Sequence, residues 1–342
     1  MSTELCSRMK VVEARSFTLD GLELVERPTP KPGRGEVLVK MRAATLNYRD
    51  LVVLTENYFP TLPLPYVPLS DGCGEVVQAG EGVTRFHVGD RILPTYTQGW
   101  YDGRPTPEQR AQRTLGAPLP GVLQEYMVVP AEDAVAAPAH LTDVEAATLP
   151  VAGLTAWSVL LEGHTKPGDV VVMQGTGGVA LFGVQFAKLM GATVIVLSSS
   201  DDKLRRAKAL GADVGINYHS VPDWPRVVRE ITGGRGADLI LETAGATLSQ
   251  SLSALAFGGF IGLVGFVAGY EAMVPVRQLV GPLNQIHGIT TGSRTSFEAM
   301  NRAVSSHRLH PVVDQVFGIE QIASAFKRMK SGKHFGKIGI VF

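Results

Sequence analysis

A glycine-rich loop in the middle of the chain has the spacing of a dinucleotide-binding turn. Gly175, Gly177 and Ala180 match the pattern G-x-G-x-x-G/A between the apolar segment 170–174 and an amphipathic segment over 178–190. The first glycine permits a tight turn, the second lets the backbone approach a pyrophosphate, and the small Ala180 lets the following helix pack close to the strand. The pattern therefore predicts that the chain binds a dinucleotide; a glycine-rich turn in a ligand-free sheet is the alternative.

The end of the next apolar segment, 193–197, indicates which dinucleotide is bound. NAD-binding versions of this arrangement usually end that strand in an acid that accepts hydrogen bonds from the ribose hydroxyls. Here three serines follow it: Ser198, Ser199 and Ser200. Hydroxyls can donate to a 2′-phosphate and Lys203 can neutralise it. Asp201 and Asp202 argue for NAD(H), although capping of the next helix also explains them. We expect NADP(H) to be favoured over NAD(H).

The segments around this loop divide the chain of 342 residues into regions of different character. Short apolar alternations separated by Gly- and Pro-containing turns fill residues 1–150, which is typical of a small antiparallel barrel or sandwich. From there to about 284, apolar strands alternate with amphipathic helices, which predicts a parallel sheet with helices on both faces. Residues 285–342 offer a further strand, a helix and a mixed C-terminal stretch.

Composition excludes several classes of function. The chain carries 32 basic and 32 acidic residues and no nucleic-acid footprint is visible in that balance. Cys6 and Cys73 are its only cysteines, so it cannot build a disulfide scaffold or a cysteine-rich metal site, and it suits a reducing compartment. The N-terminus has no apolar signal region. We expect a cytoplasmic protein that binds neither nucleic acid nor membranes.

Taken together, the landmarks of the whole chain resemble the medium-chain dehydrogenase/reductase superfamily. In chain order they are PKPGRGEVLVKMRAATLNYRDL, GEVVQAGEGVTRFHVGDRI, LPVAGLTAWSVL, KPGDVVVMQGTGGVA, AKALGADVGINY and MKSGKHFGKIGIVF. The resemblance implies an α/β fold with a doubly wound Rossmann domain over 151–284. That domain would be inserted into a GroES-like antiparallel catalytic barrel made from 1–150 and 285–342, with the active site in the cleft between them.

The zinc-dependent alcohol dehydrogenases of this superfamily hold a catalytic metal with residues that this chain replaces. By position, Asn47 stands for a cysteine, Leu69, Ser70 and Asp71 stand for Gly-His-Glu, and Val151 lies near another cysteine position. Zinc needs thiolates, imidazoles or carboxylates gathered in a tetrahedral shell, which Asp71 alone cannot supply. The four-cysteine lobe that holds a structural zinc also has no counterpart. We therefore expect no metal site.

The resemblance is then to the zinc-free branch, the quinone oxidoreductases and enone reductases. It implies hydride transfer from NADPH to a quinone or α,β-unsaturated carbonyl, which spreads the arriving charge so that a few hydrogen-bond donors suffice. By position, Asn47 would donate to the substrate carbonyl. Asp50 would orient its neighbours, or serve only as a charge at a helix N-terminus. Tyr58 could donate a phenolic proton, with aromatic packing as the alternative.

Other cofactor contacts are implied by family position. Thr155 would face the nicotinamide and Tyr218 would stack near the adenosine phosphate. Val264, Gly265 and Phe266 follow a strand at its carboxyl end, where open α/β sheets place ligands, although Val264 could equally be core. The remaining residues assigned to the cofactor site are Thr176, Gly178, Val179, Ala244 and Thr291.

The sequence leaves two alternative functions open and predicts a homodimer. The alternatives are an alcohol dehydrogenase-like enzyme that works on alcohols or aldehydes without zinc, and a non-enzymatic structural or RNA-binding use of the fold. The predicted sheet ends in segment 259–266, whose open edge must be paired or covered. Relatives pair this edge across a two-fold axis, so we expect a homodimer.

Overall fold

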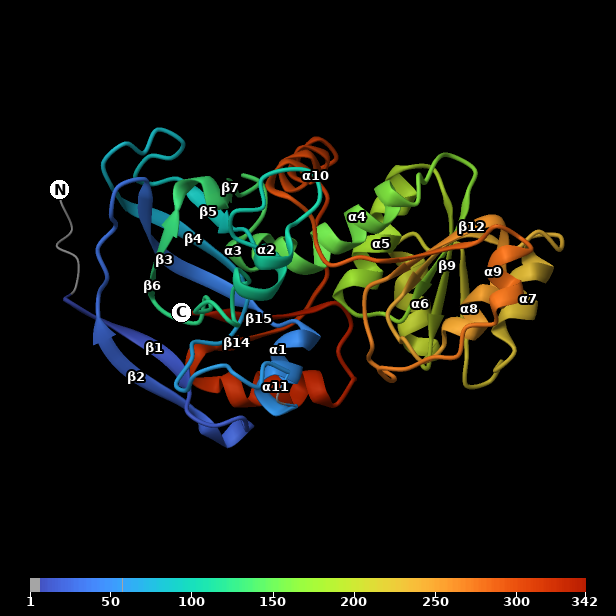
Figure 1. Cartoon of the computed structure of the whole chain (residues 1–342), viewed down its shortest axis with the longest axis horizontal. Helices are drawn as coiled ribbons and strands as arrows, with labels where there is room; N and C mark the ends of the chain where they lie inside the picture. Colours follow the sequence, from blue (N-terminus) through green and yellow to red (C-terminus); the bar gives the residue numbers. More distant parts are fainter. Residues whose placement is uncertain (1–6, 57) are drawn as a thin grey trace. The chain divides into compact units, whose positions relative to one another are not determined.

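The computed structural model describes residues 7–56 and 58–342, which form two compact units (Figure 1). The first unit comprises residues up to 151 together with 292–342, and the second comprises 152–291. The second unit thus extends beyond the boundary at 284 that the sequence predicted. The reason is that strand β13 (Gln285–Gly288) pairs in parallel with β12 (Leu255–Leu263) and so belongs to the parallel sheet.

The first unit is built on a mainly antiparallel sheet. Its strand order is β14-β15-β3-β4-β5-β7, with β6 also paired to β3 and a separate β1-β2 ribbon. These strands are β1 (Arg8–Ala14), β2 (Leu22–Pro28), β3 (Glu36–Thr45), β4 (Asp71–Ala79), β5 (Arg91–Pro94), β6 (Tyr126–Pro130), β7 (Ala134–Ala136), β14 (Val313–Gly318) and β15 (Lys337–Val341). The helices are α1 (Tyr48–Thr55), α2 (Pro107–Gln112), α3 (Asp143–Ala146), α10 (Arg294–Ser306) and α11 (Ile322–Lys330).

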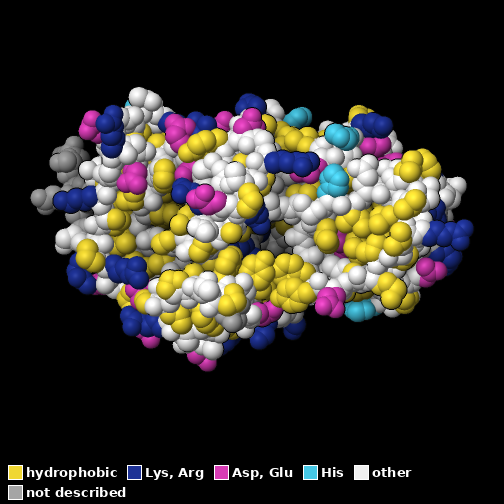
Figure 2. All heavy atoms as spheres, viewed as in Figure 1, with side chains coloured by type: hydrophobic (Ala, Val, Ile, Leu, Met, Phe, Trp, Pro, Cys, Tyr) yellow, Lys and Arg dark blue, Asp and Glu magenta, His cyan; other side chains and the backbone are white. Residues whose placement is uncertain are grey.

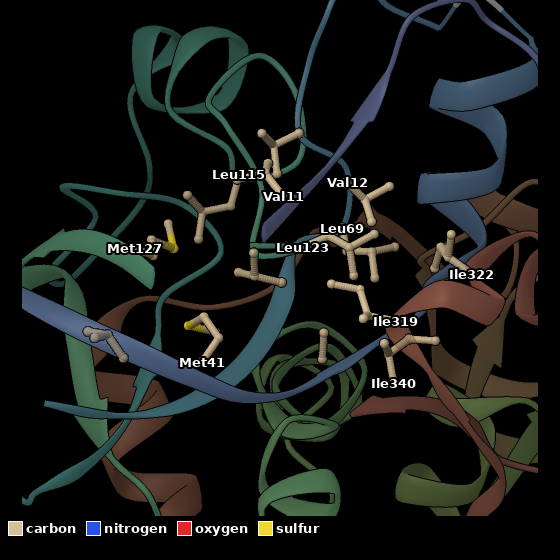
Figure 3. Close-up of a cluster of buried hydrophobic side chains, with 14 of the residues drawn as sticks. Val11, Val12, Met41, Leu69, Leu115, Leu123, Met127, Ile319, Ile322 and Ile340 are labelled. Carbon is tan, nitrogen blue, oxygen red and sulfur yellow. The ribbon is translucent and has the colours of Figure 1, made fainter. Parts of the chain in front are cut away.

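Both ends of the chain contribute to the core of this unit. Val11 from β1 and Met41 from β3 lie in one buried cluster with Ile322 from α11 and Ile340 from β15 (Figure 3). Strand β15 adds antiparallel to β3, and β3 pairs antiparallel with β4. The apolar residues near the C-terminus are therefore required to complete a sheet that begins near the N-terminus.

The second unit is a six-stranded, all-parallel sheet in the order β10-β9-β8-β11-β12-β13. Its other strands are β8 (Val170–Gln174), β9 (Thr193–Ser198), β10 (Val214–Asn217) and β11 (Ala237–Glu242). Its helices are α4 (Leu154–Glu162), α5 (Gly178–Leu189), α6 (Asp201–Ala209), α7 (Trp224–Ile231), α8 (Leu248–Ala254) and α9 (Val276–Val280), on both sides of the strands in Figure 1. This order confirms the predicted doubly wound sheet, whose order reverses between β8 and β11.

The edge of the parallel sheet differs from the prediction. Segment 259–266 contains most of β12, but β12 is covered by β13, which is the actual edge strand. The four-residue length of β13 leaves a short row of unpaired backbone groups. Pairing between copies at this side of the sheet would therefore involve β13, while β10 is the edge strand at the other side.

A long apolar helical run covers residues 143–162. Among the described residues, it is the one run whose length and composition would allow it to cross a bilayer. Most of the run is buried inside the structure, as in the core helix of a globular protein.

Candidate functional site

A buried ammonium group lies among the residues that replace the zinc ligands. Lys337, the first residue of β15, donates from Nζ to the Leu46 carbonyl oxygen at 2.8 Å, to Asn47 Oδ1 at 2.5 Å and to Asp71 Oδ2 at 3.0 Å. Its side chain is only 3% exposed. The register of β15 on β3, and of β3 on β4, brings these distant positions together, since Thr45 lies opposite both Gly339 and Asp71.

Asp71 is the counter-charge of this ammonium. The carboxylate is fully buried, and burial raises its pKa, while the charge of Lys337 and hydrogen bonds from Lys337 and Thr45 oppose that rise. Its Oδ1 atom has no hydrogen-bond partner among the described residues. The charge of Lys337 is thus the main interaction that stabilises the ionised form of Asp71.

The ammonium determines which way the Asn47 amide faces. A lysine ammonium can only donate, so the amide oxygen must point toward Lys337 and the amide nitrogen away from it. That nitrogen lies 3.3 Å from Ser70 Oγ, which is long for a hydrogen bond. Asn47 therefore presents a donor on the Ser70 side that a stronger acceptor could take over.

Ser70 is held in place by strained backbone and by Asp50. The preceding residue, Leu69, has φ of 67°, a left-handed conformation that costs roughly 1–3 kcal/mol without glycine. This position is where the zinc enzymes were expected to carry a glycine. The Ser70 hydroxyl also lies 3.5 Å from Asp50 Oδ1.

Asp50 is a buried acid at the start of helix α1. At the third position of α1 it accepts a hydrogen bond of 2.8 Å from the backbone N–H of Asn47, so it caps the helix and fixes its neighbour at once. Burial raises its pKa to about 6, against the opposing effects of Arg49 and of the Asn47 bond. Asp50 can therefore exchange a proton close to neutral pH.

Two tyrosines of the first unit, Tyr58 and Tyr66, differ in how deeply they are buried. Tyr58 is 45% exposed and packs edge-on against Phe59, which matches the packing alternative and gives no support to a catalytic role. Tyr66, which was not predicted, is 7% exposed, and its hydroxyl has no hydrogen-bond partner among the described residues. Burial and then the charge of Asp50 raise the pKa of Tyr66, so its phenol stays protonated. Tyr66 is the better candidate donor.

Sequence reasoning also missed Lys337. Its motif near the C-terminus was a landmark of the resemblance, but it lies 290 positions from Asn47. The sequence did contain a sign of this role. Lys337 begins an apolar strand pattern, and a charged residue in a buried strand needs a partner of opposite charge.

The glycine loop of the second unit has the geometry of a phosphate cradle. Gly175 has φ of 81°, and Gly177 is the N-cap of α5. A Cβ atom added at either glycine would meet nothing within 4 Å, so open space lies beside both backbones. Gly178 and Val179 start the helix half-buried beside the buried Thr176. The residues present fit a dinucleotide pyrophosphate at this helix start.

The structure brings the predicted serines and Tyr218 together at the carboxyl ends of β9 and β10. Ser198 Oγ accepts from the Ser200 N–H at 3.3 Å, and Ser200 Oγ caps α6 by accepting from the Lys203 N–H at 3.4 Å. Both hydroxyls keep their own hydrogen for donation, and Ser199 is exposed. Tyr218 bonds through its N–H to the Ser198 carbonyl at 3.1 Å.

The other predicted cofactor residues fall into two places. Thr155 is buried and donates its hydroxyl to the Thr290 carbonyl at 2.7 Å, beside Thr291. The hydroxyl of Thr291 is buried with no partner in the described part of the chain. The remaining four follow the carboxyl ends of β11 and β12: Ala244, Val264, Gly265 and Phe266.

The donor set of the first unit does not fit zinc. No group of three or more His, Cys, Asp or Glu suited to a metal occurs in residues 7–56 and 58–342. The oxygens of Asn47 and Asp71 already face an ammonium, which would repel a second cation. Burial raises the pKa of Cys73 to about 12, so its thiol stays protonated in the metal-free protein.

Comparison with known proteins identifies both parts of the chain. Residues 33–139 match the alcohol dehydrogenase GroES-like domain, and residues 178–306 match the zinc-binding dehydrogenase family. A zinc-type alcohol dehydrogenase-like protein of Schizosaccharomyces pombe is 41% identical over 96% of this chain and 97% of its own length.

Solved structures agree with this assignment. A putative alcohol dehydrogenase from Sinorhizobium meliloti 1021 is 46% identical with a TM-score of 0.94, covering 99% of this chain and 100% of that one. An NAD-dependent alcohol dehydrogenase is 37% identical with a TM-score of 0.89, covering 98% of this chain and 100% of that one. The predicted GroES-like and Rossmann fold is confirmed.

We predict that Lys337→Met destabilises the protein near neutral pH by about 3–5 kcal/mol, because it leaves a buried carboxylate without its cation. Acid should shrink this loss, since protonation of Asp71, whose pKa is already raised, removes the uncompensated charge. Urea unfolding in neutral and mildly acidic buffer measures both effects. The double variant Asp71→Asn/Lys337→Met is the control and should recover most of the stability. A loss that is equal at both pH values would contradict the charge pairing.

Proposed function

The chain belongs to the medium-chain dehydrogenase/reductase superfamily of NAD(P)-dependent oxidoreductases, and on this basis we propose that it reduces a quinone or α,β-unsaturated carbonyl with NADPH and without zinc. The observation that carries the proposal is the Lys337 ammonium bonded to Asn47 and Asp71, which stand by resemblance where the zinc enzymes carry other residues. It provides a fixed positive charge and a fixed donor where the chemistry requires electrostatic stabilisation.

The nicotinamide supplies the hydride when it is bound, and the chain must stabilise the charge that arrives on the acceptor oxygen. The Asn47 amide N–H donates to that oxygen in place of Ser70. Lys337 holds the far side of the same amide at 2.5 Å and increases its polarity. One neutral donor with a cation behind it is weaker than a metal. It therefore suits acceptors that spread their own charge, as quinones and enones do and simple aldehydes do not.

The reduced acceptor also needs a proton. Ser70 Oγ lies 3.3 Å from Asn47 Nδ2 and 3.5 Å from Asp50 Oδ1, so the hydroxyl stands between the proposed donor and a buried acid. Asp50, with a pKa of about 6, is the group that supplies this proton through Ser70. Tyr66 provides a second protonated hydroxyl near Asp50.

A second candidate function is favoured by the names of the relatives, which are alcohol dehydrogenases or resemble them. The same residues could bind the oxygen of a secondary alcohol, with Asp50 accepting its proton. Oxidation of NADPH by a quinone or enone, measured beside reduction of NADP⁺ by an alcohol, separates the two activities. The open cradle at Gly175 and Gly177 argues against a non-enzymatic use of the fold.

Asn47→Ala should lower kcat with a quinone or enone by roughly a hundredfold to a thousandfold, the usual cost of losing one oxyanion donor. The dissociation constant for NADPH should stay nearly unchanged, because Asn47 is not a residue of the proposed dinucleotide cradle. Steady-state kinetics and fluorescence titration measure the two quantities. Glu56→Ala, at the other end of α1, is the control and should leave both unchanged.

The same preparation tests the role of metal. Wild-type turnover should survive dialysis against a chelator. Turnover that disappears on dialysis and returns with zinc would overturn the proposal, as would an Asn47→Ala variant with wild-type kcat. A wild-type enzyme that reduces simple aldehydes faster than any quinone or enone would favour the alcohol dehydrogenase function.

Lys203→Ala should weaken NADPH binding about tenfold and leave NADH binding unchanged, because only NADPH carries the 2′-phosphate that the ammonium would neutralise. The observation behind this is the position of Lys203 in the first turn of α6, directly after the serine cluster. Lys208→Ala, in the last turn of the same helix, is the matched control. Equal losses for both dinucleotides, in a fluorescence titration, would remove the argument for NADP(H).

We also propose a homodimer that forms through the edge of the parallel sheet. Large apolar side chains are exposed on β12 and on the segment 273–283 that precedes β13 in the chain. They include Phe257, Met273, Val276, Val280 and Leu283, each more than half exposed. Figure 2 shows hydrophobic side chains gathered on the visible face of this unit. An open strand edge together with exposed apolar side chains of this size is typical of a surface that another protein covers.

Light scattering at micromolar concentration should therefore give the mass of a dimer. Met273→Glu/Val280→Glu should shift the protein to monomer, because two carboxylates would be buried at the interface. Val88→Glu is the matched control, since Val88 is equally exposed but belongs to the first unit. A monomeric wild type, or a dimer unaffected by the double variant, would refute this interface.

A further inference from the structure

Two buried polar side chains join β8 to β11 beyond the end of their hydrogen-bond ladder. The last paired residues of the two strands are Met173 and Leu241. One position further on, Gln174 Nε2 donates to Glu242 Oε2 at 2.6 Å. Neither side chain was predicted to matter, although Gln174 directly precedes the glycine loop and both are almost completely buried.

Glu242 is held entirely by neutral donors in the contacts that the structure describes. Its Oε1 accepts from the backbone N–H groups of Ala244 and Gly245, each at 3.0 Å, and from Thr247 Oγ1 at 2.9 Å. Its Oε2 accepts from Gln174 and from the Ser251 hydroxyl. A buried carboxylate with this many directed donors has little freedom to move, so it fixes the segment 243–245 that surrounds it.

Gln174 connects the same segment to the glycine loop. Its Oε1 accepts from the N–H of Thr243 at 3.2 Å and more weakly from Ala244, while Thr243 Oγ1 donates back to the Gln174 carbonyl at 3.1 Å. The segment 243–245 in turn holds 264–268, because Val264, Val267 and Ala268 donate their backbone N–H groups to it or to Glu242.

The bond between Gln174 and Glu242 lies where the strand order reverses. In an open parallel sheet, dinucleotides bind outside the carboxyl ends of the strands at this switch point. β8 and β11 are the two strands on either side of it. We propose that Gln174 and Glu242 are positioning residues for the dinucleotide, setting the spacing between the glycine loop and the segments 243–245 and 264–266. This inference rests on the proposed use of a dinucleotide, but not on the acceptor or on the choice between NADPH and NADH.

The proposal differs from a role in stability alone in what it predicts for binding. A residue that only stabilises the fold lowers the melting temperature and leaves the affinity of the folded protein unchanged. A positioning residue changes the dissociation constant well below the melting temperature. Because the pair acts on the loop that meets the pyrophosphate shared by both cofactors, it should affect NADPH and NADH equally.

The test is an exchange of the two side chains. Glu242→Gln is nearly isosteric, but it turns an NH₂ group toward the groups that donate hydrogen bonds to Glu242. It should weaken the binding of both NADPH and NADH by about tenfold or more, measured by fluorescence titration. The double variant Gln174→Glu/Glu242→Gln restores one amide and one carboxylate to the pair, and its affinities should return to within about threefold of wild type. Val228→Ala, in the core of the same unit, controls for lost stability and should lower the melting temperature without changing either affinity.

Three results would overturn the proposal. The first is a Glu242→Gln variant with a lower melting temperature but wild-type affinities, and the second is an exchange variant no better than the single one. The third is a wild type that binds neither NADPH nor NADH, which would overturn the proposed function as well. If the wild type binds both cofactors and Glu242→Gln binds them with wild-type affinity, only this inference is overturned.

Discussion

The bond between the Lys337 ammonium and the Asp71 carboxylate is the interaction on which the first unit depends. Removing both charges from water is costly unless each finds its partners inside, and here the partners come from β15, β4 and the residues after β3. The pairing therefore requires the C-terminal strand to add to β3 in one register. The same geometry orients Asn47, so the interaction that completes the fold also prepares the proposed site.

The second unit stabilises its buried carboxylate in another way. Glu242 is as buried as Asp71, but its described partners are backbone N–H groups, hydroxyls and one amide. Neutral donors fix a carboxylate in direction without cancelling its charge, whereas an ammonium balances the charge and leaves polarised neighbours. Neutral donors, as around Glu242, suit a loop that must hold its shape around a ligand. An ammonium, as beside Asp71, suits the proposed site, which must stabilise a developing negative charge.

In the first unit, polar contacts connect the residues that stand at the zinc-ligand positions of the resemblance. In the zinc enzymes the metal would organise its ligands. Here the ammonium of Lys337 bonds to Asn47, Ser70 follows the left-handed Leu69, and Asp50 lies within reach of Ser70 and caps α1. These residues supply donors and a buried acid, which is the chemistry that the proposed reduction of a conjugated acceptor requires.

The sequence by itself determined the features that depend on neighbouring residues: the glycine loop between a strand and a helix, and the alternation that builds the parallel sheet. Each is a pattern over a few positions, so it can be recognised without knowing the fold. Only the tertiary structure decided that Lys337 faces Asn47, that Tyr66 is more buried than Tyr58, and that Gln174 meets Glu242. It also decided that β13 extends the parallel sheet to Gly288. Those contacts join residues far apart in the chain, and strand pairing and burial select them, neither of which leaves a local spacing to detect.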